Sequence, residues 1–425
     1  MSFGRALALI AAGGLAARLV YVLVVMDGVG VAGDGLQFHI LANQLAAGDG
    51  YIQPLVVSPD HVATADKPPL YPLLLALPSL AGWDSITAQR VLSCLMGAAL
   101  VAGAGLLGRR VGGSDRAGLV AAAIASLYPL LVVLDGALRS ESLYAPLVAF
   151  ALLAAYRLKD RPTLGRAAAL GALGGAAALT RSEAVLLLVL LVAAVALRLP
   201  DGWRGRLRVG AVTLGAAALV LAPWVIRNWA EFERPLLSTN SGSLAYGANC
   251  HDAYFTGLIG SWPCYPPLRV EPGEDEADVA AALRRTGVDY AREHAGRLPA
   301  VAAARLLRSF DLWAPRSATR LEAGIGDRNL AMHRAGVLVY WLLVPLAILG
   351  AVLLRRRGEP LLLLLVPVLV VAVVSVAGYG TPRFRVPAEI PLVVLAAVAL
   401  ATLTRGRRPR GAAASSPASD PRRAA

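Results

Sequence analysis

The sequence predicts an all-α protein whose helices cross a membrane many times. Apolar residue types make up 57 % of the 425 residues and charged types only 16 %, and the mean hydropathy is +0.60. Soluble domains contain about 45–50 % apolar and about 25 % charged residues. The charged residues of this chain also stand between long apolar runs. These observations exclude a soluble enzyme, a disordered chain and a small disulfide-rich secreted module.

Ten apolar segments are long enough for membrane-spanning helices, because a helix needs about 20 apolar residues to cross the hydrocarbon core. The first segment is interpreted as an anchor and not as a signal peptide, since it lacks a clear cleavage site and contains Arg18. The apolar run 68–82 is shorter and is expected to form an interfacial or re-entrant helix. The predicted spans are 5–26, 86–108, 115–134, 141–157, 164–180, 183–199, 207–228, 333–354, 359–378 and 384–404.

The basic residues predict how these spans are oriented. With the N-terminus in the cytoplasm, the loops on that side carry a large excess of arginine, whereas the opposite side is slightly acidic. Membrane insertion favours this asymmetry. It accounts for the formal net charge of +13, so no nucleic-acid partner is needed. We expect an integral protein with both termini in the cytoplasm, and the GC-rich coding bias suits a bacterial plasma membrane.

The spans and loops divide the chain into four parts. Residues 1–228 are expected to form a bundle of seven spans, with a first outer loop at 27–85. Residues 229–332 form an extracytoplasmic loop that is too long for a simple connector. Residues 333–404 hold the last three spans. The basic tail 405–425 is expected to be disordered and to lie near anionic lipids.

Part of the long outer loop carries a helical pattern of apolar residues. We expect two short amphipathic helices within 274–310. In the second of them, Leu306 and Phe310 belong to the expected apolar face. Arg305 and Arg308 flank that face and are expected to extend toward lipid headgroups.

Two of the three cysteines fall in this outer loop. Cys250 and Cys264 lie in an oxidising compartment under the predicted orientation, and their spacing closes a small loop, so we expect a disulfide. The alternative is two free thiols. A metal site is less favoured, because His251 alone would not complete a four-ligand set. Cys94 lies within a predicted span and is expected to be an inert core residue.

Ionisable residues recur at the outer ends of the predicted spans, where the orientation rule disfavours basic groups. Short turns cannot carry these side chains far from the bilayer, so we expect them to lie at one level. Ionisable residues at a membrane mark functional sites. They are Asp34 and His39 in the first outer loop, Asp66 and Lys67 shortly before Tyr71, Arg139 and Glu141, Arg181 and Glu183, and Arg383 and Arg385.

These residue types suit the transfer of a sugar from a lipid-linked phosphate. Cations at the headgroup level can bind a phosphate and stabilise it as it leaves. A single acid between two glycines, as at Asp34, can take the proton of an acceptor hydroxyl. The sequence therefore predicts a glycosyltransferase with its site at the outer membrane face.

At these positions the sequence resembles the polyprenyl-phosphate-dependent glycosyltransferases of the GT-C superfamily. Within it, the protein-mannosyltransferase-like family 39 and the lipid A aminoarabinose transferases are the most similar branches. The resemblance covers most of residues 1–400 and implies a GT-C-type bundle, a sugar donor carried on polyprenyl phosphate and an inverting reaction. The matching stretches are GDGLQFHILANQLAAGDGY, ADKPPLYP, RSESLY, TRSE, APWVIRN and RFRVPAEIPL.

The resemblance also implies roles for single residues. Asp34 matches the catalytic base, and Lys67 matches the basic residue near the donor phosphate. Arg383 and Arg385 match a late basic motif that binds the same phosphate, and Arg139 is grouped with them by its charge and placement. Contacts with the sugar or the acceptor are expected from Asp66, Glu141, Arg181, Glu183, Tyr71 and His39.

Two features depart from the family pattern. Gly35 follows Asp34 where many family members have a second acid, and no large additional outer domain fits in the chain. The acceptor therefore stays open between a hydroxyl of an envelope glycan, a lipid or a protein. The transferred sugar stays open between a hexose and a pentose.

Other interpretations of the same residues remain. Asp34 can be a simple turn residue, the arginine–glutamate pairs can serve only to neutralise each other, and His39 and Tyr71 can be structural. No acidic or histidine cluster has a recognisable metal-ligand spacing, so no cofactor is expected, with a divalent cation as the alternative. The alternative functions are a transporter or flippase of a lipid-linked saccharide and a ligase that uses a diphosphate lipid.

Overall fold

The computed structural model describes residues 1–55, 62–200, 202–266, 274–315 and 329–404. Within these ranges the chain is all-helical, and its β-structure is limited to one bridge between Ile52 and Ala63. The predicted all-α fold is thus confirmed for the described residues. The predicted basic tail lies outside them.

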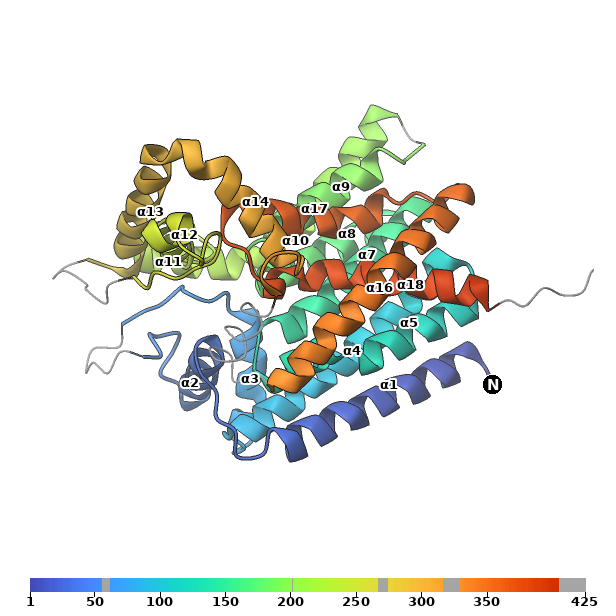
Figure 1. Ribbon diagram of the computed structural model, residues 1–425, viewed down its shortest axis with the longest axis horizontal. Helices are drawn as coiled ribbons and strands as arrows, with labels where there is room; N and C mark the ends of the chain where they lie inside the picture. The colour runs from blue at the N-terminus through green and yellow to red at the C-terminus, as the bar shows by residue number, and fades with distance from the viewer. Residues whose placement is uncertain (56–61, 201, 267–273, 316–328, 405–425) are drawn as a thin grey trace, which may run out of the picture.

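A bundle of long apolar helices forms the body of the molecule (Figure 1). α4, α7 and α18 are largely buried at its centre, whereas α1, α10 and α16 expose most of their apolar surface on the outside. The bundle helices are α1 (Phe3–Val20) with its π-helical continuation η1 (Tyr21–Val25), α4 (Ile86–Gly112), α5 (Asp115–Leu127), α6 (Pro129–Gly136), α7 (Glu141–Asp160), α8 (Leu164–Ala178), α9 (Ala184–Ala196), α10 (Trp203–Phe232), α16 (Leu330–Arg356), α17 (Leu362–Ala377) and α18 (Val386–Leu403).

All ten predicted spans fall on helices, but not all of these helices have the length of a membrane span. Among the described residues, six helices are long and apolar enough, and the pair α5–α6, bent by 50°, makes a seventh. α8, α9 and α17 have 15, 13 and 16 residues, which is short for the bilayer core. The protein is an integral membrane protein, and its described residues hold six or seven helices with the length and composition of a span. The remaining three crossings stay a prediction.

The bend between α5 and α6 has a specific cause. Pro129 lacks a backbone N–H, so the carbonyl of Ala125 has no helical donor. Arg18 of α1 supplies donors to the carbonyls of Ala125 (3.0 Å) and Ser126 (2.9 Å). Its charge is balanced by Asp135, whose Oδ2 lies 2.8 Å from Arg18 Nε. The bend is therefore stabilised from within the bundle, and α6 ends beside the first outer loop.

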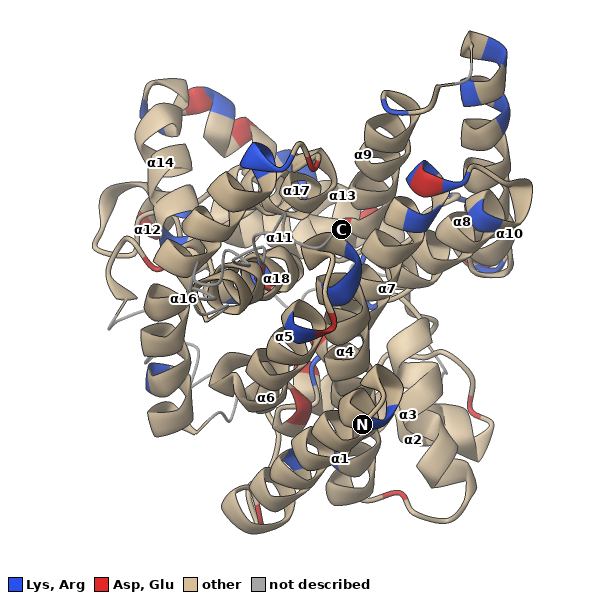
Figure 2. Cartoon of the chain, turned by 90° about the vertical axis from the view of Figure 1, so that its right-hand side faces the viewer, with Lys and Arg blue, Asp and Glu red and all other residues tan. Residues whose placement is uncertain are grey.

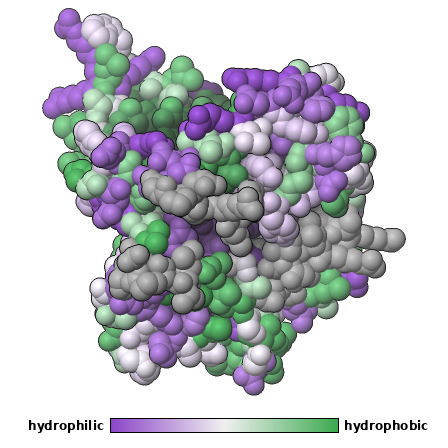
Figure 3. Space-filling view, turned by 90° about the vertical axis from the view of Figure 1, so that its left-hand side faces the viewer, coloured by the Kyte–Doolittle hydropathy of each residue, from purple (hydrophilic) through white to green (hydrophobic). Residues whose placement is uncertain are grey.

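Shorter helices gather at one end of the bundle, at the left of Figure 1. Figure 3 looks onto this end, where hydrophilic and hydrophobic side chains are mixed. The short helix predicted within 68–82 and the two predicted within 274–310 are confirmed there. The helices of this end are α2 (Asp34–Ala47), α3 (Leu70–Leu80), α11 (Ser241–Ala248), α12 (His251–Phe255), α13 (Glu276–Glu293), η2 (Ala295–Arg297) and α14 (Leu298–Ser309).

The placement expected for two arginine side chains of α14 is wrong. Arg305 and Arg308 are only 4 % and 3 % exposed and do not extend toward lipid. Arg305 donates to the carbonyls of Val376 (2.9 Å) and Ala248 (2.6 Å), and Arg308 donates to that of Ile259 (2.6 Å). These carbonyls lie in non-helical or helix-end backbone that needs donors. The two arginines thereby join the outer loop to the end of α17.

The opposite end of the bundle is rich in basic residues (Figure 2). They include Arg109 and Arg110 at the end of α4 and Arg204, Arg206 and Arg208 at the start of α10. The first residues of α1 and the last of α18 lie at this end as well (Figure 1). The arrangement agrees with the predicted charge asymmetry, and the cytoplasmic orientation itself stays a prediction.

Candidate active site

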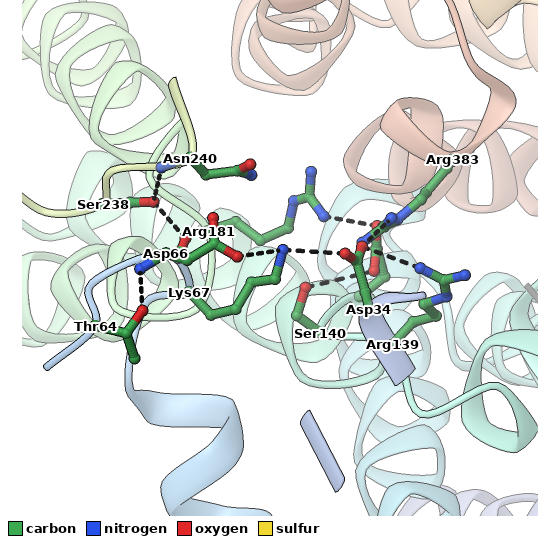
Figure 4. A network of polar contacts seen from close by, with 11 residues as sticks. Asp34, Thr64, Asp66, Lys67, Arg139, Ser140, Arg181, Ser238, Asn240 and Arg383 are labelled. Carbon is green, nitrogen blue, oxygen red and sulfur yellow. Dashed lines mark hydrogen bonds and ion pairs between the residues drawn. The ribbon is translucent and has the colours of Figure 1, made fainter. Parts of the chain in front are cut away.

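Three cations from three separate segments contact one carboxylate at the end of the bundle where the shorter helices gather (Figure 4). Asp34 is the first residue of α2. Its Oδ1 lies 3.0 Å from Lys67 Nζ, and its Oδ2 lies 3.0 Å from an Arg139 nitrogen and 2.5 Å from an Arg383 nitrogen. Sequence analysis assigned these four residues to one candidate site at a common level, and the structure brings them into contact. Their roles in catalysis and phosphate binding stay a prediction.

Glycines on either side allow Asp34 to reach this position. Gly33 has φ = 54°, which L side chains rarely adopt. At Gly35 a Cβ atom would lie 2.8 Å from the carbonyl oxygen of Ala137. The start of α2 therefore packs directly against the end of α6. This contact gives a physical reason for a glycine where the family pattern has a second acid.

The surroundings of Asp34 set its charge state. Burial raises the pKa of Asp34, but the charges of Lys67, Arg383 and Arg139 outweigh it and hold that pKa well below the ordinary value of 3.8. Burial likewise lowers the pKa of Lys67, and Asp34 and Asp66 together raise it well above its usual value. Both side chains are therefore charged at neutral pH.

Glu141 extends the network to a second carboxylate. It is 1 % exposed and accepts from Arg181 (2.6 Å) and from Arg383, which bridges it to Asp34. Arg181 also pairs with Glu183. We refer to the charged cluster as the set of four cations and four carboxylates Asp34, Asp66, Lys67, Arg139, Glu141, Arg181, Glu183 and Arg383.

One donor in this cluster has no acceptor among the described residues. Arg139 is 4 % exposed, and its Nε is buried without a hydrogen-bond partner. A buried guanidinium N–H without an acceptor costs free energy unless something else fills the position. The site therefore has spare capacity to bind an anion.

The backbone around Lys67 is held by residues that sequence analysis missed. Glu276, at the start of α13, accepts from the Ala65 amide (3.1 Å) and from the Gln53 side chain (2.5 Å). Glu276 is half-buried, and nothing in the sequence distinguishes it from the other acidic residues of this polar segment. Tyr51 donates to the Lys67 carbonyl (2.8 Å). These contacts fix the loop that presents Lys67 to Asp34.

Arg90 is a second residue that sequence analysis missed. It lies inside α4 and is 1 % exposed. It donates to the carbonyls of Val29 (2.7 Å), Gly30 (2.8 Å) and Gly136 (2.6 Å). It thus joins the loop before Asp34 to the end of α6, from which Arg139 follows. The sequence could have indicated Arg90 as a functional or positioning residue through its place within a predicted apolar span.

Three predicted site residues are held by hydrogen bonds or ion pairs to partners outside the cluster. Arg385 is 1 % exposed and pairs with Glu389 (2.5 Å) and Asp311 (2.8 Å) in a separate buried network. His39 contacts a glutamine of α4, and Tyr71 shares a hydrogen bond with a buried serine. These contacts hold helices together, and none of them involves Asp34.

The described residues contain no group of three or more histidine, cysteine, aspartate or glutamate side chains placed to bind a metal ion. The carboxylates of the charged cluster are occupied by cationic side chains instead. The divalent cation that the sequence left as an alternative stays a prediction. The predicted disulfide between Cys250 and Cys264 is confirmed, and Cys94 is a buried free thiol.

Comparison with known proteins agrees with this architecture. The model of the family of dolichyl-phosphate-mannose-protein mannosyltransferases matches residues 66–227, which is less than half of the chain. No curated protein matches the sequence. Among solved structures, the Archaeoglobus fulgidus oligosaccharyltransferase, in a complex with zinc and sulfate, is similar with a TM-score of 0.56 and 16 % identity. That match covers 94 % of this chain and 49 % of the other, so this chain spans about half its length.

A second solved structure is similar at a lower level. ArnT from Cupriavidus metallidurans, bound to undecaprenyl phosphate, matches over 93 % of this chain and 77 % of its own, with 15 % identity and a TM-score of 0.40. That superposition is too loose to support an argument. The likeness to the oligosaccharyltransferase concerns the fold, and the chain has the GT-C fold that its sequence predicts.

Proposed function

We propose that the protein is an inverting glycosyltransferase that moves one monosaccharide from a polyprenyl-phosphate donor to a hydroxyl group outside the membrane. The observation that carries this proposal is the contact of Lys67, Arg139 and Arg383 with Asp34 at the outer end of a GT-C bundle. The match to the dolichyl-phosphate-mannose family supports a sugar carried on a polyprenyl phosphate. The sugar and the acceptor, on an envelope glycan, a lipid or a protein, stay open.

The residues of the cluster divide the chemistry between them. The acceptor oxygen attacks the anomeric carbon and forms the new glycosidic bond, while Asp34 takes the hydroxyl proton. The bond from the anomeric carbon to the phosphate oxygen breaks, and its electron pair stays on the phosphate. The phosphate gains a negative charge in this step, and Lys67, Arg139 and Arg383 stabilise that charge. Glu141 holds Arg383 and Arg181 in place.

The cations act on both partners of the reaction. In the structure they hold the Asp34 carboxylate and keep its pKa far below 3.8, which makes it a weak base. A donor phosphate attracts the same cations, so their hold on Asp34 is reduced when the donor binds. The pKa of Asp34 then rises toward the range of an effective base. Donor binding and base activation are coupled in this proposal.

The pH dependence of the rate is expected to show this coupling. Asp34 must be ionised to act, so activity falls as the pH falls through its pKa. The acid limb of kcat/KM, which reports the free enzyme, should lie below pH 3.8. The acid limb of kcat, which reports the donor complex, should lie at a higher pH. Initial rates over about pH 3 to 8 test this: the acid limb of kcat should fall within that range, whereas kcat/KM should fall little above its lower end. Limbs that coincide within the range would contradict the coupling.

The function itself is tested on the whole protein in lipid nanodiscs. We expect one member of a panel of radiolabelled polyprenyl-phosphate hexoses and pentoses to release free polyprenyl phosphate when envelope extract supplies the acceptor. Nucleotide sugars and polyprenyl-diphosphate sugars serve as matched controls and should give no release. Release only from a diphosphate lipid would favour a ligase. Movement of a donor across the bilayer without cleavage would favour a transporter, and either outcome would overturn the proposal.

A further inference from the structure

A row of aromatic side chains leads from the exposed surface of the outer loop to the charged cluster. Tyr265 is 66 % exposed, and its ring centroid lies 5.1 Å from that of Trp262. The centroid of Trp262 lies 6.3 Å from that of Tyr379, and Tyr379 lies 4.8 Å from Phe384. Phe384 directly follows Arg383. We call Tyr265, Trp262, Tyr379 and Phe384 the aromatic row.

The inner end of the row touches the cluster from a second side. The guanidinium of Arg181 lies 5.6 Å from the centroid of the Phe384 ring, within the range of a cation–π contact. Arg181 in turn donates to Glu141. The row therefore ends against the residues that surround Asp34, and not at an arbitrary place on the surface.

The middle of the row is held in place by backbone contacts. Trp262 donates through Nε1 to the carbonyl of Ser243 (3.0 Å). Its indole packs on Gly247, where a Cβ atom would lie 2.1 Å from Nε1. Cys264, between the two outer members of the row, is fixed by its disulfide to Cys250. The outer rings are thus rigidly placed on the loop.

The two segments that carry the row are joined to each other. Gly380 donates to the carbonyl of Gly260 at 2.7 Å, which links the turn after Tyr379 to the loop before Trp262. A Cβ atom at Gly380 would lie 2.2 Å from the carbonyl oxygen of Arg305. Because of this close packing, the rings of the two segments keep fixed positions relative to each other.

We propose that the aromatic row is the acceptor subsite, and that the acceptor is a saccharide; this inference rests on the function proposed above. The C–H faces of sugar rings pack on aromatic rings, while their hydroxyl groups remain free for hydrogen bonds. Tryptophan and tyrosine combine such an apolar face with a polar group. Tyr265, Trp262 and Tyr379, which are exposed or half-buried, suit contacts with successive sugar units. Phe384 is buried, and it marks where the row meets the cluster around Asp34.

The geometry distinguishes the row from an interfacial aromatic belt. Aromatic residues of a belt lie at one level around a bundle. Exposure in this row instead decreases inward, from 66 % at Tyr265 to 8 % at Phe384, with Trp262 and Tyr379 half-buried. A row of rings that runs inward to the charged cluster suits a ligand that must reach this cluster. Rings that only contact lipid would not need to run inward.

Saccharide binding to the whole protein in nanodiscs tests the inference. The probes are mannotriose, galactotriose and arabinotriose, observed by saturation-transfer difference NMR. We expect transfer to at least one of them, and a loss of about fivefold in Trp262→Ala. Trp262→Phe keeps the ring face and should retain the signal, as should Trp83→Ala, which removes a tryptophan 69 % exposed elsewhere on the surface. Tyr265→Ala, at an exposed position, gives a second variant that does not disturb the core.

The outcomes separate the inference from the function on which it rests. Absence of transfer to all three trisaccharides, or transfer of equal strength in Trp262→Ala and Tyr265→Ala, overturns the subsite. Release of polyprenyl phosphate, measured on the same samples, reports the donor reaction independently. Normal release without saccharide binding overturns only the subsite. Saccharide binding that depends on Trp262, without release from any donor, overturns only the glycosyltransferase.

Discussion

Replacement of Asp34 by asparagine is expected to abolish transfer and, at the same time, to strengthen the binding of polyprenyl phosphate. The substitution removes the base, and loss of a general base lowers a rate by about 10²- to 10⁴-fold. It also removes the carboxylate that occupies Lys67, Arg139 and Arg383 in the structure. With that competitor gone, these cations are free to bind the phosphate.

The expected increase in affinity is modest. Asp34 is 25 % exposed, and ion pairs at partly exposed sites contribute about 0.2–1 kcal/mol each. Relief of three such pairs corresponds to roughly a tenfold lower Kd for polyprenyl phosphate. Titration of the lipid phosphate into nanodiscs that contain each variant gives the Kd directly, and the release assay gives the rate.

Asp115→Asn is the matched control for this experiment. Asp115 pairs with Arg109 at the opposite end of the bundle and is 56 % exposed, so the same chemical change there should alter neither quantity. If Asp34→Asn lowered both the rate and the affinity, Asp34 would be part of the phosphate site and not a competitor for it. If the rate were unchanged, Asp34 would have no role as a base.

The residues of the charged cluster could be predicted because a membrane limits where they can lie. Arg139, Glu141 and Arg181 stand in short turns between apolar helices, so their distance from the bilayer is nearly fixed by the sequence. Lys67 precedes two prolines at the start of a short apolar helix, which places it at the same level. Together with the family motifs, these restraints identified the residues that meet around Asp34.

The direction in which an arginine points could not be predicted in the same way. Arg305 in α14 and Arg385 in the turn before α18 are both buried, although a basic residue at a membrane can equally extend to headgroups. The deciding partners are the Val376 carbonyl for the first and Glu389 with Asp311 for the second. Such acceptors come from segments far apart in the chain, and apolar periodicity carries no information about them.

The positioning residues were missed for a related reason. Arg90 binds three backbone carbonyls, and Glu276 accepts from a backbone amide and a glutamine. A carbonyl is present at every residue, so its use by a distant side chain leaves no pattern in the sequence. The geometry of the charged cluster therefore depends on contacts that appear only once the helices are placed.

The second large effect is expected from Arg383. This residue bridges Asp34 and Glu141, and in the proposed reaction it stabilises the leaving phosphate. Loss of one such donor lowers a rate by about 10²- to 10³-fold. Arg383→Gln should therefore reduce transfer strongly and weaken the binding of polyprenyl phosphate. The effect on binding is opposite in sign to that of Asp34→Asn.

Stability measurements should accompany this variant. Glu141 is 1 % exposed and would retain only Arg181 as a direct ionic partner. Leaving a buried charge partly unpaired costs about 1–3 kcal/mol. We therefore expect a lower midpoint of thermal unfolding for Arg383→Gln, with partial recovery of both stability and rate in Arg383→Lys, which keeps the charge but not the two-sided contact.

A double-variant cycle separates the two roles of Arg383. Arg110→Gln, which breaks an ion pair with Asp160 at the opposite end, controls for the loss of a surface arginine. If Asp34 and the phosphate compete for Arg383 as proposed, the effects of the two substitutions on lipid-phosphate affinity are coupled and do not add. Asp34→Asn should then gain no affinity in the Arg383→Gln background beyond what Lys67 and Arg139 provide. Full additivity would mean that the cation binds the phosphate without releasing the base, and donor binding would then not activate Asp34.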